Sequence, residues 1–86
     1  MKNMPEKKFR AGAITLAIWK NQAPLKDGQL SEYKTISLER GYQDKDGLWK
    51  NTTHFRVNDL PKAALVLSKA YEYLTLTGQE TIVGAL

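Results

Sequence analysis

The chain has 86 residues, no cysteine, and 13 lysines and arginines against 9 aspartates and glutamates, which gives a net charge of +4. Disulfides are therefore excluded, and a zinc cage is nearly excluded because His54 is the single histidine. This length suits one domain with a thin core, and the basic excess favours an anionic partner. Because no secretion signal or membrane-spanning apolar run is visible, we expect a cytoplasmic protein.

The predicted domain begins after a short basic arm. Residues 1–8 are polar and predict a disordered arm, residues 9–76 a single domain, and residues 77–86 a tail. A first strand is expected near 11–19, where apolar residues alternate with others. Its apolar face comprises Ile14, Leu16 and Ile18. Pro24, Asp27 and Gly28 then predict a long polar loop over 21–31.

Two further strands are expected at 33–42 and 48–57, on either side of a tight turn at 44–47 with the sequence Asp-Lys-Asp-Gly. A four-residue loop would pair Gln43 with Leu48, which gathers apolar residues on one face and polar residues on the other. The pairs that follow from this register are Ile36 with Phe55, Leu38 with Thr53, and Tyr42 with Trp49.

A helix is expected from about Asp59 to about Leu74, because Asn58 and Asp59 can cap it and Pro61 suits its first turn. The apolar stripe predicted to cover the sheet comprises Leu60, Ala63, Ala64, Leu67, Ala70, Tyr71 and Leu74. Three apolar residues lie off this stripe, and they indicate either a homodimer contact or a wider core: Leu65, Val66 and Tyr73. The predicted fold is α+β: a three- to four-stranded antiparallel meander followed by one C-terminal amphipathic helix, as a homodimer.

Catalytic chemistry has little support in the sequence. His54 beside Thr52, Thr53 or Ser37 is the available nucleophile–base arrangement, and it would lie on a flat sheet face. The turn at 44–47 has part of a calcium-loop pattern without the remaining carboxylates. We therefore expect a non-enzymatic protein without a metal, a cofactor or a small-molecule substrate.

The open face of the sheet, away from the helix, is expected to combine aromatic, hydroxyl and cationic side chains. Rings stack with bases and cations bind phosphates, so this combination favours single-stranded DNA or RNA as the partner. The candidate nucleic-acid-binding residues are Arg10, Trp19, Lys20, Tyr33, Tyr42, Lys50, His54 and Arg56. An ordinary solvated sheet face has a similar composition. Tyr42 and Trp49 could likewise serve only to lock the hairpin.

The stretch Ile36–Leu74 resembles the single-stranded-DNA-binding transcriptional coactivators of the positive cofactor four family. The similarity is carried by an aromatic–x–Asp–x–x–Gly pattern at Tyr42, Asp44 and Gly47, with Lys50 after it. The resemblance implies a curved antiparallel sheet followed by a helix, dimerisation through the helix and a sheet edge, and binding of a single strand with little sequence specificity. That family has four strands, and residues 9–12 could supply the fourth.

Two other functions are compatible with the pattern. A small protein-interaction or assembly module would use the apolar helix strip or a free sheet edge to bind a protein. A double-stranded-RNA binder would need a helix before the first strand, and residues 7–18 do not have a helical pattern.

Overall fold

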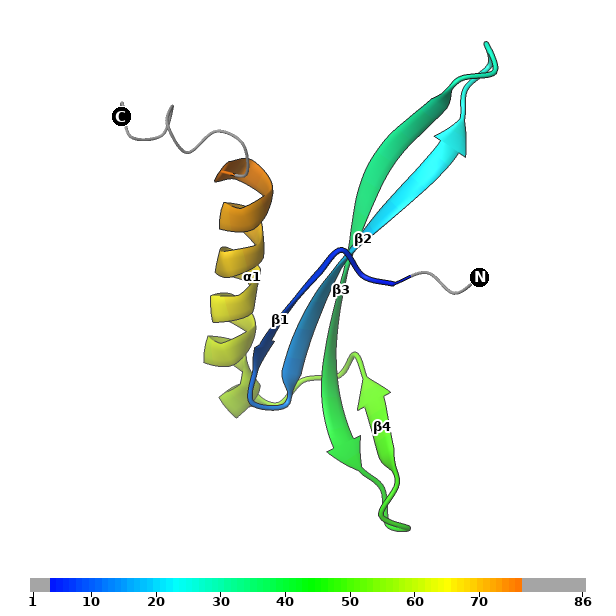
Figure 1. Cartoon of the computed structure of the whole chain (residues 1–86). Helices are drawn as coiled ribbons and strands as arrows, with labels where there is room; N and C mark the ends of the chain where they lie inside the picture. The colour runs from blue at the N-terminus through cyan, green and yellow to red at the C-terminus, as the bar shows by residue number, and fades with distance from the viewer. Residues whose placement is uncertain (1–3, 77–86) are drawn as a thin grey trace, which may run out of the picture.

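A computed structural model describes residues 4–76 of the chain. Four antiparallel strands in chain order are followed by one helix, which confirms the predicted α+β meander. Figure 1 shows α1 alongside one face of the sheet, with the β2–β3 hairpin extending past it. The elements are β1 (Lys7–Ala11), β2 (Ile14–Pro24), β3 (Leu30–Gln43), β4 (Trp49–Thr52), the short 3₁₀ helix η1 (Val57–Asp59) and α1 (Leu60–Leu76). The tail predicted at 77–86 lies outside the described residues.

The fourth strand is β1, and it begins before the domain boundary expected at residue 9. The backbone N–H of Glu6 already donates to the carbonyl of Ile18 at 2.7 Å, and Lys7 lies opposite Ile18 in the ladder. Gly12 and Ala13 then turn the chain into β2. Gly12 has φ +60°, the left-handed backbone that a glycine-first hairpin turn requires.

The segment expected to be a long polar loop, residues 21–31, is a continuous hairpin, so that prediction was wrong. β2 runs to Pro24, β3 starts at Leu30, and the two strands stay in one register along their length. Both faces of the projecting hairpin meet solvent, so its strands need no apolar alternation. A polar composition therefore could not distinguish these strands from a loop.

The β2–β3 and β3–β4 hairpins both turn on the tripeptide Lys-Asp-Gly, at residues 26–28 and 45–47. The glycines have left-handed backbones, with φ +88° at Gly28 and +83° at Gly47. The closing hydrogen bonds run from Leu25 N–H to the Gln29 carbonyl at 2.7 Å and from Asp44 N–H to the Leu48 carbonyl at 2.9 Å. Each turn is therefore a three-residue loop that ends on its glycine.

The three-residue loop moves the pairing of β3 and β4 by one residue from the predicted register. Gln43 lies opposite Trp49, where a four-residue loop would have placed Leu48. β4 also ends at Thr52. The predicted pairs Ile36 with Phe55, Leu38 with Thr53, and Tyr42 with Trp49 do not form. A shift of one residue exchanges the two faces of a strand, so β4 presents each side chain on the face opposite to the predicted one.

The core lies between α1 and the first two strands. Ile14, Leu16 and Ile18 are fully buried, as their alternation predicted. α1 packs mainly on β1 and β2. Ile36 lies opposite Ile18 in the ladder and stays 45% exposed. The partly buried residues around this core are Phe9, Ala11, Leu38, Phe55, Tyr73 and Leu74.

α1 packs through a face that contains only part of the predicted stripe: Ala63 and Ala70 are buried and Leu74 is partly buried, as predicted. Its buried residues are Ala63, Val66 and Ala70, and the two small alanines let the helix approach the sheet closely. Of the residues predicted for a dimer contact, Val66 is in the core, Tyr73 is partly buried, and only Leu65 stays exposed. The residues predicted to be buried that are exposed instead are Leu60, Ala64, Leu67 and Tyr71.

Contacts of Tyr73 hold the helix in this rotation. Its hydroxyl donates to Glu6 Oε2 at 2.9 Å, and its ring meets Phe9 edge-on with centroids 6.1 Å apart. Lys34 Nζ donates to the same Glu6 oxygen at 3.0 Å. The hydrogen bonds from Lys34 and then Tyr73 hold the pKa of Glu6 below its ordinary value, and the bond to Glu6 raises the pKa of Tyr73. The helix rotation therefore depends on a residue that the sequence had assigned to a disordered arm.

Candidate functional site

The strand register divides the sheet into a helix-side face and an open face. Opposite residues in an antiparallel pair point to the same face, and successive residues along a strand point to alternate faces. Because Leu16 is buried beneath α1, its neighbour Thr15 lies on the open face, together with Arg10 and Glu39 opposite it. The open-face side chains are Lys8, Arg10, Thr15, Ala17, Trp19, Asn21, Ala23, Ser31, Tyr33, Thr35, Ser37, Glu39, Gln43, Trp49 and Asn51.

The cations of the two faces differ in their partners. Four helix-side cations form ion pairs: Lys20 with Glu32 at 3.8 Å, Lys34 with Glu6 at 3.0 Å, Arg40 with Asp59 at 3.4 Å, and Lys50 with Asp44 at 3.2 Å. On the open face, Lys8 and Arg10 have no carboxylate partner within residues 4–76. The Nε of Arg10 donates to the Gly12 carbonyl at 3.0 Å, which leaves its terminal nitrogens for other acceptors. The open-face cations are therefore available to an anionic ligand.

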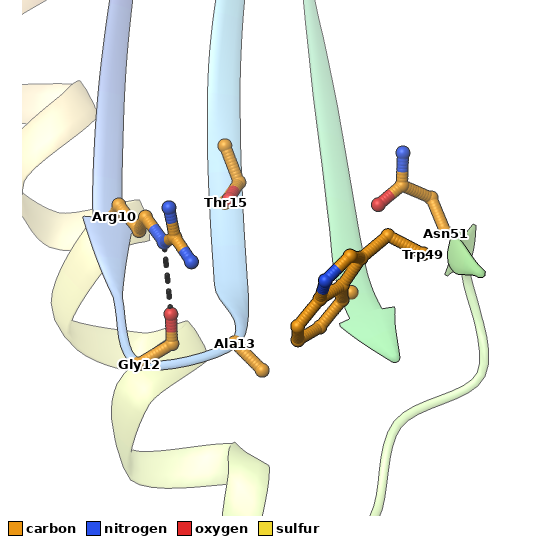
Figure 2. A pocket seen from close by; sticks show the side chains of 7 residues that line it. Arg10, Gly12, Ala13, Thr15, Trp49 and Asn51 are labelled. Carbon is orange, nitrogen blue, oxygen red and sulfur yellow. Dashed lines mark hydrogen bonds between the residues drawn. The ribbon is translucent and has the colours of Figure 1, made fainter. Parts of the chain in front are cut away.

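A hollow of about 370 Å³ lies on the open face between the β1–β2 turn and β4. Figure 2 shows Arg10 with its hydrogen bond to Gly12 on one side and the ring of Trp49 on the other. Trp49 is 71% exposed, so its ring offers a free face to a ligand. The lining residues of this hollow, called the Trp49 hollow below, are Arg10, Gly12, Ala13, Thr15, Gly41, Trp49 and Asn51.

A second hollow of about 230 Å³, the Trp19 hollow, adjoins the first and shares Thr15 and Asn51 with it. Trp19 Nε1 donates to Ser37 Oγ at 3.0 Å, which fixes the orientation of the indole. Lys8 lines the same hollow. The remaining lining residues of the Trp19 hollow are Ala17 and Glu39. Within the described sheet, Glu39 is the one acidic side chain on the open face. Each hollow thus contains one tryptophan and one cation.

The open face continues from the Trp19 hollow along the β2–β3 hairpin. Tyr33 lies there, half-exposed, opposite Asn21 in the ladder. The Asn21 amide donates to Thr35 Oγ1 at 3.0 Å, so the polar side chains of this segment are partly fixed by one another. A ring at this position extends the aromatic surface beyond the two hollows.

The structure brings together only part of the predicted binding set. Arg10, Trp19 and Tyr33 lie on the open face, as expected. The other five lie elsewhere: Lys20, Tyr42 and Lys50 on the helix-side face, and His54 and Arg56 in the segment between β4 and η1. Tyr42 and Trp49 are on opposite faces and therefore form neither a lock nor a shared platform.

Three residues of the two hollows were missed from sequence: Lys8, Trp49 and Asn51. Lys8 had been assigned to the disordered arm, and the one-residue shift had placed the two β4 residues on the wrong face. A glycine that ends a Lys-Asp-Gly tripeptide is the signal for a three-residue loop with a left-handed last residue. That signal at Gly47 would have paired Gln43 with Trp49.

Asp44 holds the turn that determines the position of Trp49. Its Oδ1 accepts hydrogen bonds from the backbone N–H groups of Asp46 at 2.8 Å and Leu48 at 3.0 Å. The bond from Leu48, with smaller contributions from Lys50 and the other turn amides, holds the pKa of Asp44 below its ordinary value. The carboxylate that orders this turn is therefore ionised at neutral pH.

Comparisons with protein-family models, with curated proteins and with solved structures give no match to this chain. Within residues 4–76, no helix has the length and apolar character needed to cross a membrane. In the same part of the chain, no group of three or more potential ligand side chains could hold a metal ion. The open face therefore has to be interpreted from its own geometry.

Proposed function

We propose that this protein binds single-stranded nucleic acid along the open face of its sheet, without catalysing a reaction. The observation that supports the proposal is the presence of one tryptophan and one cation without a carboxylate partner in each of two adjoining hollows. Unpaired bases expose faces that stack on aromatic rings, while cations bind the phosphates. A duplex hides those base faces, so such a surface favours single strands.

Rings and cations would contribute to binding in different ways. Stacking of a base on an aromatic side chain contributes roughly 1–3 kcal/mol. Trp49 can accept a base without any rearrangement, because most of its surface is already exposed. Each phosphate neutralised by Lys8 or Arg10 makes the slope of log affinity against log salt more negative by about 0.7. The rings therefore supply affinity that depends little on salt, and the cations supply the salt-dependent part.

Little sequence preference is expected, because every base has a π face and stacking is tolerant of base identity. Thr15, Ser37 and Asn51 add hydroxyl and amide groups between the rings. The resemblance to single-stranded-DNA-binding coactivators favours the same class of ligand. A four-stranded meander followed by a helix is also the arrangement that the resemblance implies.

Fluorescence titration tests the proposal directly, because Trp19 and Trp49 are the two tryptophans of the chain. We expect a short oligonucleotide to quench this fluorescence at lower concentration than the corresponding duplex does. If Lys8 and Arg10 each neutralise one phosphate, log affinity should fall with log salt at a slope near −1.4 between about 50 and 200 mM. Equal affinity for duplex and single strand, or no binding at about 50 mM salt, would contradict the proposal.

We also propose that two copies of the chain associate through an apolar strip on α1. The strip consists of Leu60, Ala64, Leu67 and Tyr71, which recur at helical spacing and are all exposed. It contains no charged residue, so a self-complementary contact brings no like charges together. Only seven apolar residues are buried in the described part of the chain, and a second copy would extend this thin core.

Sedimentation tests the association. We expect a species of twice the 9.7 kDa chain mass at tens of micromolar. Leu67→Glu should convert it to a monomer, whereas Leu65→Glu, similarly exposed but outside the strip, should not. A monomer of the unmodified chain would contradict the homodimer. It would favour the alternative, in which the strip or a sheet edge binds a different protein.

A further inference from the structure

We infer that Trp19 and Trp49 bind bases several nucleotides apart on one nucleic-acid strand, so that full affinity requires a strand long enough to span both hollows. This inference rests on the proposed function, which requires only that a single strand crosses the open face. The spacing of the rings adds the class of ligand: an oligonucleotide, in preference to a nucleotide, a dinucleotide or the end of a strand.

The register of the sheet determines the spacing of the two rings. Trp19 lies opposite Thr35 and Trp49 lies opposite Gln43, eight residues further along β3. A β-strand advances about 3.4 Å per residue, so the two tryptophans are attached about 27 Å apart along β3. Nucleotides stacked as in one strand of a duplex advance about 3.4 Å each, so this spacing corresponds to about eight nucleotide steps. An extended strand covers it in fewer steps, but two neighbouring nucleotides cannot.

The two hollows form one path between the rings. Thr15 and Asn51 line both of them, so a ligand can pass from one hollow to the other without crossing an intervening side chain. Thr15 lies opposite Glu39, which is halfway between the partners of the two tryptophans on β3. The hollows therefore meet midway, with one ring at each end of the path.

The charges beside this path indicate where the phosphates of a bound strand would lie. Lys8 and Arg10 are on the open face of β1, and neither has a carboxylate partner within residues 4–76. Glu39 lies on the far side of Thr15 from Arg10, because β2 separates β1 from β3. Phosphates between the two stacked bases would therefore follow β1, away from the carboxylate on β3.

The two tryptophans allow each hollow to be observed separately. Incorporation of 5-fluorotryptophan should give two ¹⁹F resonances, and Trp49→Phe assigns them while Trp19 stays in place. The probes are thymidylate oligomers from the dinucleotide up to about 16 nucleotides, the upper end of the site sizes of single-strand-binding folds. We expect a long oligomer to shift both resonances with one midpoint, and the dinucleotide to shift them with different midpoints. Once an oligomer reaches the second ring, affinity should rise by a further factor of roughly 5 to 150, because a second stack is added.

A matched pair of variants tests whether the second ring causes this rise. Trp49→Ala should abolish the step in affinity with length, whereas Leu48→Ala, at the adjacent exposed residue, should retain it. If the dinucleotide shifts both resonances with one midpoint, or if affinity grows only in proportion to length, the inferred spacing is wrong even though single strands bind. If no oligomer shifts either resonance, the proposed function fails as well.

Discussion

The two faces of the sheet contain similar side chains and use them differently. On the helix-side face, the ion pairs of Lys34 with Glu6 and of Arg40 with Asp59 join β3 to the residue before β1 and to η1. On the open face, Lys8 has no carboxylate partner within residues 4–76, and Trp49 stands exposed. Four cations on the first face are held in ion pairs, whereas Lys8 and Arg10 on the second remain available to a ligand.

If the open face binds a ligand as proposed, the partners of a cation are a better guide to a binding surface than the sign of its charge. Lys50 and Arg10 are both exposed cations on the sheet. Lys50 already lies 3.2 Å from a carboxylate oxygen of Asp44, whereas Arg10 donates to a backbone carbonyl and has no carboxylate partner within residues 4–76. The following experiments would break or sharpen the distinction between the faces.

The largest difference is expected from neighbouring residues on β2. Leu16 is fully buried on the helix side, so Leu16→Ala should lower the free energy of unfolding by about 2–5 kcal/mol. Thr15→Ala, one residue away on the open face, should change it by no more than about 0.5 kcal/mol. Urea denaturation measures both. Similar losses for the two variants would mean that the open face is also part of the core.

A smaller effect is expected when the open face loses a ring. Trp49→Ala should weaken binding of single-stranded DNA by roughly 1–3 kcal/mol. It should leave the free energy of unfolding nearly unchanged because the ring is largely exposed. Leu48→Ala is the matched control, since Leu48 is the adjacent residue and is similarly exposed without an aromatic ring. Titration at fixed salt compares them, and an equal loss for both would argue against stacking on Trp49.

Removal of one cation from each face should change the salt dependence on one face only. Arg10→Gln should flatten the slope of log affinity against log salt by about 0.7, the contribution of one phosphate contact to a single strand. Lys50→Gln should leave that slope unaltered, because Lys50 lies on the helix-side face beside Asp44. Titrations at several salt concentrations give both slopes. A flatter slope for Lys50→Gln would show that the bound strand also reaches the helix side.

The smallest expected effect is on acid stability. Hydrogen bonds from Lys34 and Tyr73 lower the pKa of Glu6 below its ordinary value of 4.5. A carboxyl group whose pKa is lower in the folded state stabilises the protein when the pH is above its pKa in the unfolded chain. This stability is lost as the pH falls through its pKa in the folded protein. The melting temperature of the unmodified chain should fall between neutral pH and about pH 3, and Glu6→Gln should make this fall smaller. Lys34→Gln should also make the fall smaller. An unaltered pH profile of the melting temperature in both variants would refute the assignment of this stability to Glu6.

The elements that sequence predicted well are those determined by local pattern. Alternation placed Ile14, Leu16 and Ile18 in the core, and the Asn-Asp-x-Pro segment predicted a helix start at about Asp59, one residue before the observed start at Leu60. The site was predicted less well, because the face of a residue in β4 depends on the length of one turn. A loop one residue shorter than expected brought Trp49 to the open face and removed Lys50 from it.

The face of the helix that packs could not be read from periodicity for a different reason. Apolar residues surround much of α1, so the 3.6-residue period is compatible with more than one buried stripe. The choice is made by contacts distant in sequence, above all the hydrogen bond from Tyr73 to Glu6. Val66 consequently lies in the core, and Leu67 and Tyr71 lie outside it.

The short length of β4 has a consequence for solubility. β4 pairs with β3 only at residues 40–43, so within residues 4–76 the outer edge of β3 over 30–39 has no neighbouring strand. An exposed edge of this length can add strands from other molecules and begin an aggregate. Glu32 and Lys34 place charges of opposite sign along it, and charged side chains on an edge discourage such addition. Apolar replacements at these two positions would therefore endanger the protein through self-association at high concentration, before any effect on its core.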